Sequence, residues 1–300
     1  MIDAFSDTLK VFPRGLVFVG LGMVILVMAK LARDVVTSYH IDEEVTEKNN
    51  LAVALRLSGY LIGVVLVFLG ALYQPLTLIA VDGFGFDRAY AEEVLRVFAY
   101  SLGGIVALNL VRVLMDRLIL YKFNIEKEIV EGQNVGTGAA EFGMYVATGL
   151  MIAGAISGEG GSTETAAALN ALAFFGMGLA LLVLFALFYQ FTTPFDIHSE
   201  IEGGNTAVGI AFGGNLIAIG LVTFKALFGD FVAWDESIAA FLAFAVLGFA
   251  LLYVLRIIID KAMLPTVRIS NSLAEGRNVG VAFVEGAVVI SAAMILFLAI

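Results

Sequence analysis

Eight long apolar stretches, separated by short polar segments, run the length of this sequence. About 20 apolar residues suffice to cross the ~30 Å hydrocarbon core of a bilayer as an α-helix. Inside lipid every backbone polar group must be satisfied internally, which a helix achieves on its own. We therefore predict an all-α membrane protein with about eight transmembrane helices. The predicted spans are residues 9–32, 51–79, 94–120, 135–157, 166–191, 206–228, 237–259 and 279–299.

The composition excludes several classes of function. Charged residues make up only 15% of the chain, and the loops are too short to hide a soluble domain. A net charge of −10 argues against nucleic acid as a partner, because that would need a basic surface. The chain has no Cys, and its only histidines are His40 and His198. We expect the lipid bilayer as partner, no cofactor, no multi-histidine metal site and, since no catalytic motif is found, no enzyme activity.

Lys and Arg are distributed unevenly between the two sides of the predicted spans. Eleven of the seventeen flank the first, third, fifth and seventh loops, five lie on the other side, and Arg56 falls inside a span. Because cytoplasmic loops carry the excess of Lys and Arg, the odd-numbered loops are predicted to be cytoplasmic. Both termini are then predicted to lie outside the cytoplasm.

The same four-residue motif, Glu-x-x-Asn, precedes every even-numbered span, and small residues follow it. Asn is a favoured helix N-cap, and small residues let neighbouring helices approach closely. The motif can be interpreted as a helix start alone, or as a ring of Glu and Asn side chains that lines a cytoplasmic vestibule. The four copies are Glu47 and Asn50, Glu131 and Asn134, Glu202 and Asn205, and Glu275 and Asn278.

A second similarity relates the two halves of the chain. Two of the four asparagines are followed seven residues later by a glutamate, Glu141 in the first half and Glu285 in the second. The third and seventh spans also end alike, which we interpret as local ion pairs and interfacial anchors. These endings are Arg112 with Asp116 and Arg256 with Asp260.

We infer two domains of four helices, residues 1–160 and 161–300, each built as a duplicated helix pair. Each pair crosses the membrane twice and returns to its starting side, so all copies must point the same way. We therefore predict parallel pseudosymmetric repeats around an axis along the membrane normal, in a pseudo-two-fold or pseudo-four-fold bundle.

The second half resembles a known family. Its stretch from Phe188 to Gly214 contains a Thr-Pro step, a Gly-Gly-Asn-Thr-Ala helix start and glycines one to two turns further on. A second helix start, Glu-Gly-Arg-Asn-Val, begins at Glu275. These features resemble domain of unknown function 350, the YjfL-like family of bacterial inner-membrane proteins. The first half departs from that pattern at Leu51, in place of Thr, and at Arg56.

Because the usual family member has four helices, the resemblance implies a tandem pair of such domains in a bacterial inner membrane. The termini, which the Lys and Arg distribution places outside the cytoplasm, are then predicted to be periplasmic. Family members are associated with stress-related envelope gene clusters. The resemblance therefore also implies a role in ion or polyamine handling.

Three ionisable residues lie within the predicted spans: Arg56, Glu141 and Glu285. Such residues are costly in lipid and often mark function. They could form a structural Arg–Glu pair, bind a cation or proton, or extend to the interface. We predict a channel or transporter for a small cation (a proton, metal ion or polyamine) that uses both glutamates. The alternative is a non-conducting scaffold that recruits envelope-stress or membrane-organising proteins, or further copies of itself.

Overall fold

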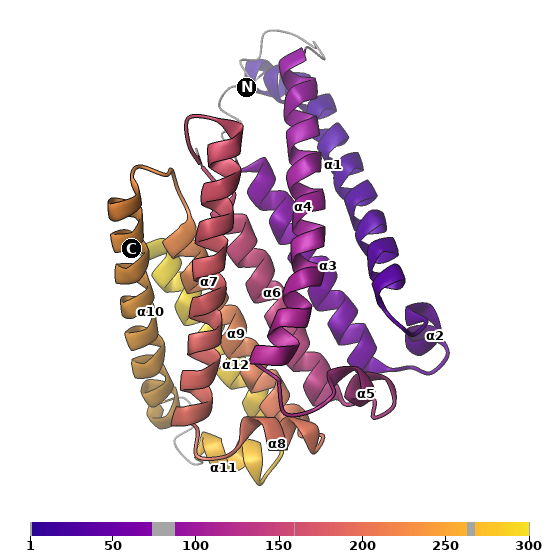
Figure 1. Ribbon diagram of the computed structural model, residues 1–300, viewed down its shortest axis with the longest axis vertical. Coiled ribbons are helices and arrows are strands. Elements are labelled where there is room, and N and C mark those ends of the chain that lie inside the picture. The colour runs from indigo at the N-terminus through magenta and orange to yellow at the C-terminus, as the bar shows by residue number, and fades with distance from the viewer. Residues whose placement is uncertain (1, 74–87, 159, 263–267, 300) are drawn as a thin grey trace.

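The computed structural model describes residues 2–73, 88–158, 160–262 and 268–299 (Figure 1). In these residues the chain forms twelve helices and no strand, which confirms the all-α prediction. Eight of the helices are long and follow the predicted spans, although residues 74–79 of the second span lie outside the described part. The long helices are α1 (Ile2–Val36), α3 (Leu51–Leu72), α4 (Arg88–Leu118), α6 (Val135–Ala155), α7 (Glu164–Thr192), α9 (Thr206–Leu227), α10 (Trp234–Ala262) and α12 (Val279–Ala299).

Seven of these long helices, all except α6, are long and apolar enough to cross a membrane. Helix α6 is also long, but its glycines, threonines and Glu141 lower its hydropathy. Its position explains this composition, since every residue of α6 except Val135, Phe142 and Ala155 is buried. A helix that neighbouring helices shield from lipid does not need an apolar surface.

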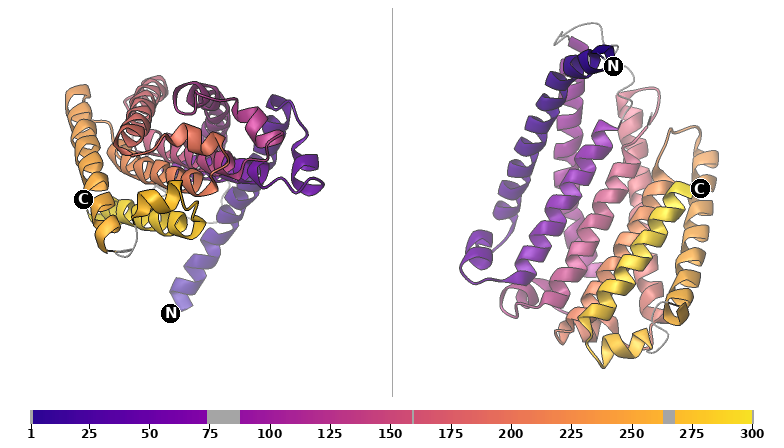
Figure 2. Two further views of the ribbon diagram at one scale, coloured as in Figure 1. Left: turned by 90° about the horizontal axis from the view of Figure 1, so that it is seen from below. Right: turned by 180° about the vertical axis from the view of Figure 1, so that it is seen from behind.

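Helices α3, α6, α9 and α12, here called the inner helices, run parallel and stand side by side in that order (Figure 2). Helix α4 packs on α3 and α6, α7 on α6 and α9, and α10 on α9 and α12, while α1 packs on α3 and α4. Within the described residues the repeats thus form an open row with α3 and α12 at its two ends. The parallel arrangement agrees with the prediction, but the predicted two-fold or four-fold bundle was wrong, because neighbouring repeats pack in sequence without closing.

Glycine brings the inner helices into backbone contact. A side chain at Gly143 of α6 would place its first carbon only 2.2 Å from the carbonyl oxygen of Gly213 in α9. At Gly59 of α3 the corresponding distance is 2.6 Å to the Cα of Phe142. Only residues without a side chain allow this approach, which explains the small residues after each Asn.

A short helix precedes each inner helix, and all four short helices lie at the same end of the molecule (Figure 1). They were not predicted from the sequence. Their signal is an Ile followed four residues later by Val, Ile or Leu, which places two apolar side chains on one face of a single turn. They are α2 (Ile41–Thr46), α5 (Ile125–Val130), α8 (Ile197–Glu202) and α11 (Ile269–Ala274).

Candidate functional site

An ion pair lies in the interface between α3 and α6. Nε of Arg56 is 2.7 Å from Oε2 of Glu141, and the two side chains are 1% and 0% exposed. The repeat explains the pairing: Arg56 is six residues after its capping Asn and Glu141 is seven after its own, and the two helices pack nearly in register. Nη1 of Arg56 also donates to the Tyr39 hydroxyl at 3.3 Å. Each charge therefore keeps a partner where lipid and protein would otherwise desolvate it.

A second buried arginine extends this cluster. Arg33 of α1 lies over the rings of Tyr60 and Tyr145, with Cζ 5.6 and 5.5 Å from their centroids. Nη1 of Arg33 donates to Oδ1 of Asn109 at 3.4 Å, and Nδ2 of Asn109 donates to the Tyr60 hydroxyl at 2.9 Å. Cation–π contacts of this kind stabilise a guanidinium away from water. Sequence reasoning treated Arg33 only as a flanking charge and missed its aromatic and amide partners.

A third arginine connects the cluster to the end that carries the short helices. Nε of Arg112 lies 3.4 Å from Oδ2 of Asp116, and its Nη2 donates to Oε2 of Glu126 in α5 at 3.3 Å. The Ser38 hydroxyl donates to the same carboxylate of Glu126. These two hydrogen bonds, the one from Ser38 first, hold the pKa of Glu126 below its ordinary value although partial burial opposes them.

Asp116 joins the outer and inner parts of the cluster. It is close enough to Arg56 and to Glu141 to interact electrostatically with both. Ionisable groups therefore follow one another from α5 at the molecular end to Glu141 inside the helix row. The corresponding pair on α10, Arg256 and Asp260, has side chains outside the described part of the structure.

Several polar atoms of this cluster are buried without a hydrogen-bond partner. They are Nη2 of Arg33, Nη2 of Arg56, Oδ1 of Asp116, Oε1 of Glu141 and the hydroxyl oxygen of Tyr145. Buried polar atoms are satisfied in the great majority of native proteins, so a concentration of exceptions requires an explanation. We name these side chains, together with Arg112, Asn109 and Tyr60, the charged cluster.

Glu285 occupies the equivalent place in the interface between α9 and α12, and it is 3% exposed. Ala211 stands where the first pair of helices has an arginine. In the third repeat the equivalent of Glu141 is Phe212, whose ring packs on Tyr189 at 5.8 Å. The two glutamates therefore lie in separate interfaces, with the glycine contact of α6 and α9 between them, and the structure does not bring them together.

The repeated motif caps each inner helix. Asn50, Asn134, Asn205 and Asn278 each accept a hydrogen bond from a backbone N–H in the first turn that follows. The glutamates of the motif, Glu47, Glu131, Glu202 and Glu275, are exposed, and the vestibule that they could line stays a prediction. The first three asparagines instead donate through Nδ2 to carboxylates five or six residues upstream, Glu44, Glu128 and Glu200.

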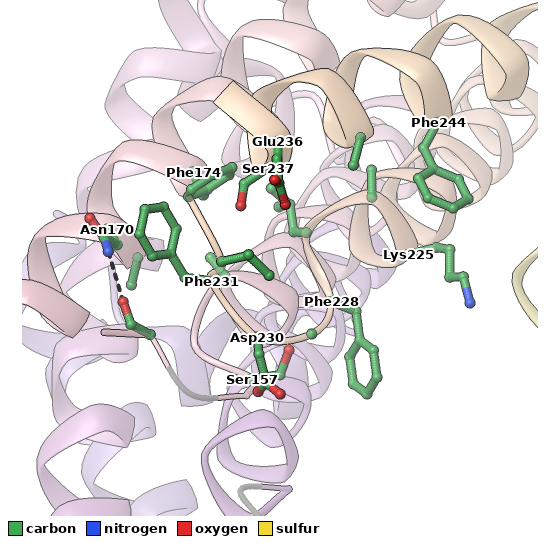
Figure 3. Close-up of a pocket in the computed structure, with 18 residues that line it drawn as sticks. Ser157, Asn170, Phe174, Lys225, Phe228, Asp230, Phe231, Glu236, Ser237 and Phe244 are labelled. Carbon is green, nitrogen blue, oxygen red and sulfur yellow. Dashed lines mark hydrogen bonds between the residues drawn. The ribbon is translucent and has the colours of Figure 1, made fainter. Parts of the chain in front are cut away.

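Two hollows lie at the opposite end of the molecule. One, of about 380 Å³, lies between α6, α7, α9 and α10, where Ser157, Asn170 and Asp230 supply polar groups among phenylalanines (Figure 3). The Asn170 side chain donates to the Gly160 carbonyl at 2.7 Å across its rim. The other, of about 530 Å³, is mostly apolar, is lined by all four inner helices, and reaches Leu150 of α6.

The fold and this cluster define a multi-pass α-helical membrane protein with tandem repeats. The family described as Domain of Unknown Function (DUF350) matches residues 7–156 and 163–300, so the chain belongs to this family, as its sequence features indicated. A UPF0719 transmembrane protein of Aquifex aeolicus (strain VF5) is 18% identical over 256 residues, which cover 85% of this chain and 88% of that protein. No solved structure matches the chain.

Proposed function

We propose that this chain is a transporter for a small cation rather than an enzyme, and that the cation is the proton, exchanged at Glu141. The observation that carries the proposal is the charged cluster itself. It connects Glu126, at the end with the short helices, through Arg112 and Asp116 to the fully buried carboxylate of Glu141. A carboxylate that is desolvated and held beside an arginine can take up a proton when its partner shifts away.

The tight packing around Glu141 favours the proton over a metal ion or a polyamine. One turn before it, a side chain at Gly138 would place its first carbon 2.6 Å from the carbonyl oxygen of Ala52. One residue after it, Phe142 contacts Gly59 backbone to backbone. A hydrated ion needs a cavity, whereas a proton needs only a chain of polar groups.

The opposite side of such a path would start at the apolar hollow. Its lining includes Leu150, which follows Tyr145 by five residues, about 7.5 Å along the helix axis. Tyr145, buried beside Glu141 and with a hydroxyl that lacks a hydrogen-bond partner, is the group of the cluster nearest this hollow on α6. We propose that the proton passes between Tyr145 and this hollow during the transport cycle.

We place the protein in the bacterial inner membrane, with the short helices in the cytoplasm and both termini in the periplasm. The excess of Lys and Arg at the end with the short helices supports this orientation. Alkaline phosphatase fused to the C-terminus tests it: we expect activity, because this reporter folds only outside the cytoplasm, and an inactive fusion would reverse the orientation.

Proton flux in proteoliposomes with an internal pH dye tests the proposed activity. We expect dissipation of an imposed pH gradient by the wild type and at least a tenfold slower rate for Glu141→Gln. The exposed Glu236→Gln serves as a matched control, since that residue lies on α10 far along the chain from the cluster and should leave the rate unchanged. Wild-type liposomes that hold the gradient as long as empty ones would refute proton transport.

A non-conducting scaffold is the second candidate, and the α6–α9 interface favours it. Two facing glycines, Gly143 and Gly213, close that interface backbone to backbone. A rigid wall of this kind could organise other membrane proteins. It predicts that Glu141→Gln alters the stability of the protein and that no cation crosses the membrane.

A further inference from the structure

Neighbouring inner helices always contact each other through the same positions, counted from the capping Asn. The ninth residue of one helix packs on the eighth residue of the next, and the same pair meets at all three interfaces. These pairs are Gly59 with Phe142, Gly143 with Gly213, and Gly214 with Gly286. The interface is therefore directional: each repeat has a leading face and a trailing face, and only different faces meet.

The caps follow the same rule. Besides capping its own helix, the Asn of each repeat donates through Nδ2 to the fifth residue of the short helix in the next repeat. The bonds run from Asn50 to the Ile129 carbonyl at 2.9 Å, from Asn134 to Ile201 at 2.7 Å, and from Asn205 to Leu273 at 2.9 Å. Each of the first three repeats thus donates one buried hydrogen bond to the repeat that follows it.

No inner helix follows α12 in the described residues. Asn278 caps α12 through Oδ1, but it is exposed, and in the described residues its Nδ2 has no acceptor. Along α12, Gly280, Ala287 and Ser291 are all exposed, whereas their equivalents in α3, α6 and α9 are buried against the next helix. Only 28% of the α12 span is buried, compared with 78% of the α9 span.

The first repeat has the complementary end. The fifth residue of α2 is Val45, whose carbonyl corresponds to the acceptors in the later short helices. The face of α3 that corresponds to the receiving faces of α6, α9 and α12 contains Ser58 at the eighth position, which is exposed. Helix α1 packs on α3 and α4 and leaves this position exposed.

We propose that the partner of α12 is α3 of a second copy of this chain, so that the row continues from one molecule into the next. Asn278 of one copy then donates to the Val45 carbonyl of the other, and Ala287 packs against Ser58. The proposed interface between two copies repeats the contacts of the three interfaces inside the chain. Such a head-to-tail contact joins unlike faces, so it produces closed rings or open chains of copies. This proposal is independent of proton transport.

Directed disulfide formation tests the contact, because the chain has no cysteine of its own. Two versions with different tags, Ser58→Cys and Ala287→Cys, are expressed together and oxidised in native membranes. We expect covalent dimers that carry both tags, well in excess of dimers with one tag twice. Replacing Ala287→Cys by Val246→Cys, on the lipid-facing side of α10, is the matched control and should abolish the mixed dimer.

A second measurement does not depend on cysteine geometry. Native mass spectrometry from a mild detergent should show oligomers of the wild type, at least half of which dissociate to monomers in Ala287→Trp. Val246→Trp, on a helix face that is also exposed, should keep the wild-type distribution. A monomeric wild type without mixed disulfides would overturn the proposal, and so would an oligomer insensitive to Ala287→Trp, since another protein, lipid or surface would then cover α12.

Discussion

The ion pair between Arg56 and Glu141 allows a quantitative prediction. At the observed 2.7 Å, two unit charges in an effective dielectric of 20 attract each other by about 6 kcal/mol. Removing either partner leaves the other buried and uncompensated, which costs about 3–5 kcal/mol. We therefore expect Arg56→Met and Glu141→Met each to lower the free energy of unfolding by about 4 kcal/mol. The double variant removes both desolvation costs and should lose about 2 kcal/mol at most, because replacing a buried ion pair by apolar residues is often neutral.

The two single losses minus the double loss give a coupling energy of about 6 kcal/mol or more, the size of the direct attraction or larger. Unfolding in mixed micelles of SDS and a mild detergent, followed by circular dichroism, measures all four proteins. The pair of Arg88 and Glu92 is a matched control, because it has the same 2.7 Å separation but is exposed, so its coupling should be close to zero. If the double variant at 56 and 141 loses as much as the two single variants together, the side chains are not coupled and the charged cluster is not a unit.

Three further predictions follow from the same geometry. In the monomer, Asn205→Ala should lower the free energy of unfolding by about 2–4 kcal/mol and Asn278→Ala by about 1 kcal/mol. Both changes remove a helix cap, but only Asn205→Ala also breaks a buried hydrogen bond to the next repeat. Chemical unfolding of the two variants measures the difference. Gly143→Ala should lower the free energy of unfolding by about 1–3 kcal/mol, because the added methyl group overlaps the backbone of α9. At Gly103 an added methyl group meets open space, so Gly103→Ala should leave the thermal stability unchanged or raise it. The hydrogen bond from Lys122, supported by a backbone N–H, holds the pKa of Asp196 below its value in the unfolded chain. The stabilisation is therefore present above about pH 4 and is lost as the pH falls through the lower pKa of the folded state. The variant Asp196→Asn keeps the helix cap, and its melting temperature should lack this loss at acidic pH.

The sequence predicted the long helices well, because each apolar run is long and polar segments separate it from the next. The weakest run became α6, whose Glu141 and glycines lower its hydropathy. Hydropathy reports contact with lipid rather than passage through the membrane, and α6 is shielded on nearly all sides. The least apolar helix of such a protein is therefore the one to expect at its centre.

The arrangement of the helices could not be predicted in the same way. A fourfold motif is compatible with a ring or with a row, and the difference depends on which faces pack, which a repeat alone does not reveal. The contacts of the Glu-x-x-Asn motif could not be predicted from its spacing either. Glu47 is three residues from Asn50, yet Asn50 donates its hydrogen bond to Glu44, because the chain reverses at Asn49 through a left-handed backbone conformation. Such a reversal is rare outside glycine, and no sequence period encodes it.

The charged cluster could be predicted only in part, for a related reason. Arg56 and Glu141 stand out because each interrupts an apolar run. Arg33, Asn109 and Tyr145 do not, since a charge near a helix end or a tyrosine in a span has an ordinary explanation. Their common role appears only when α1, α4 and α6 are seen to meet around α3.

The three interfaces between inner helices differ in their charged side chains, which indicates that the cluster does more than hold helices together. The contact of α6 and α9 is the closest in the row, with Gly143 against Gly213, and it needs no charged side chain. The contact of α9 and α12 keeps the glutamate but has Ala211 where α3 has Arg56. Since neighbouring inner helices, in the part of the chain that the structure describes, pack without an ion pair at the other two interfaces, packing does not explain why arginines from α1, α3 and α4 and their acidic partners gather at this one. Their concentration around the interface of α3 and α6 is the arrangement expected if that interface alone exchanges protons.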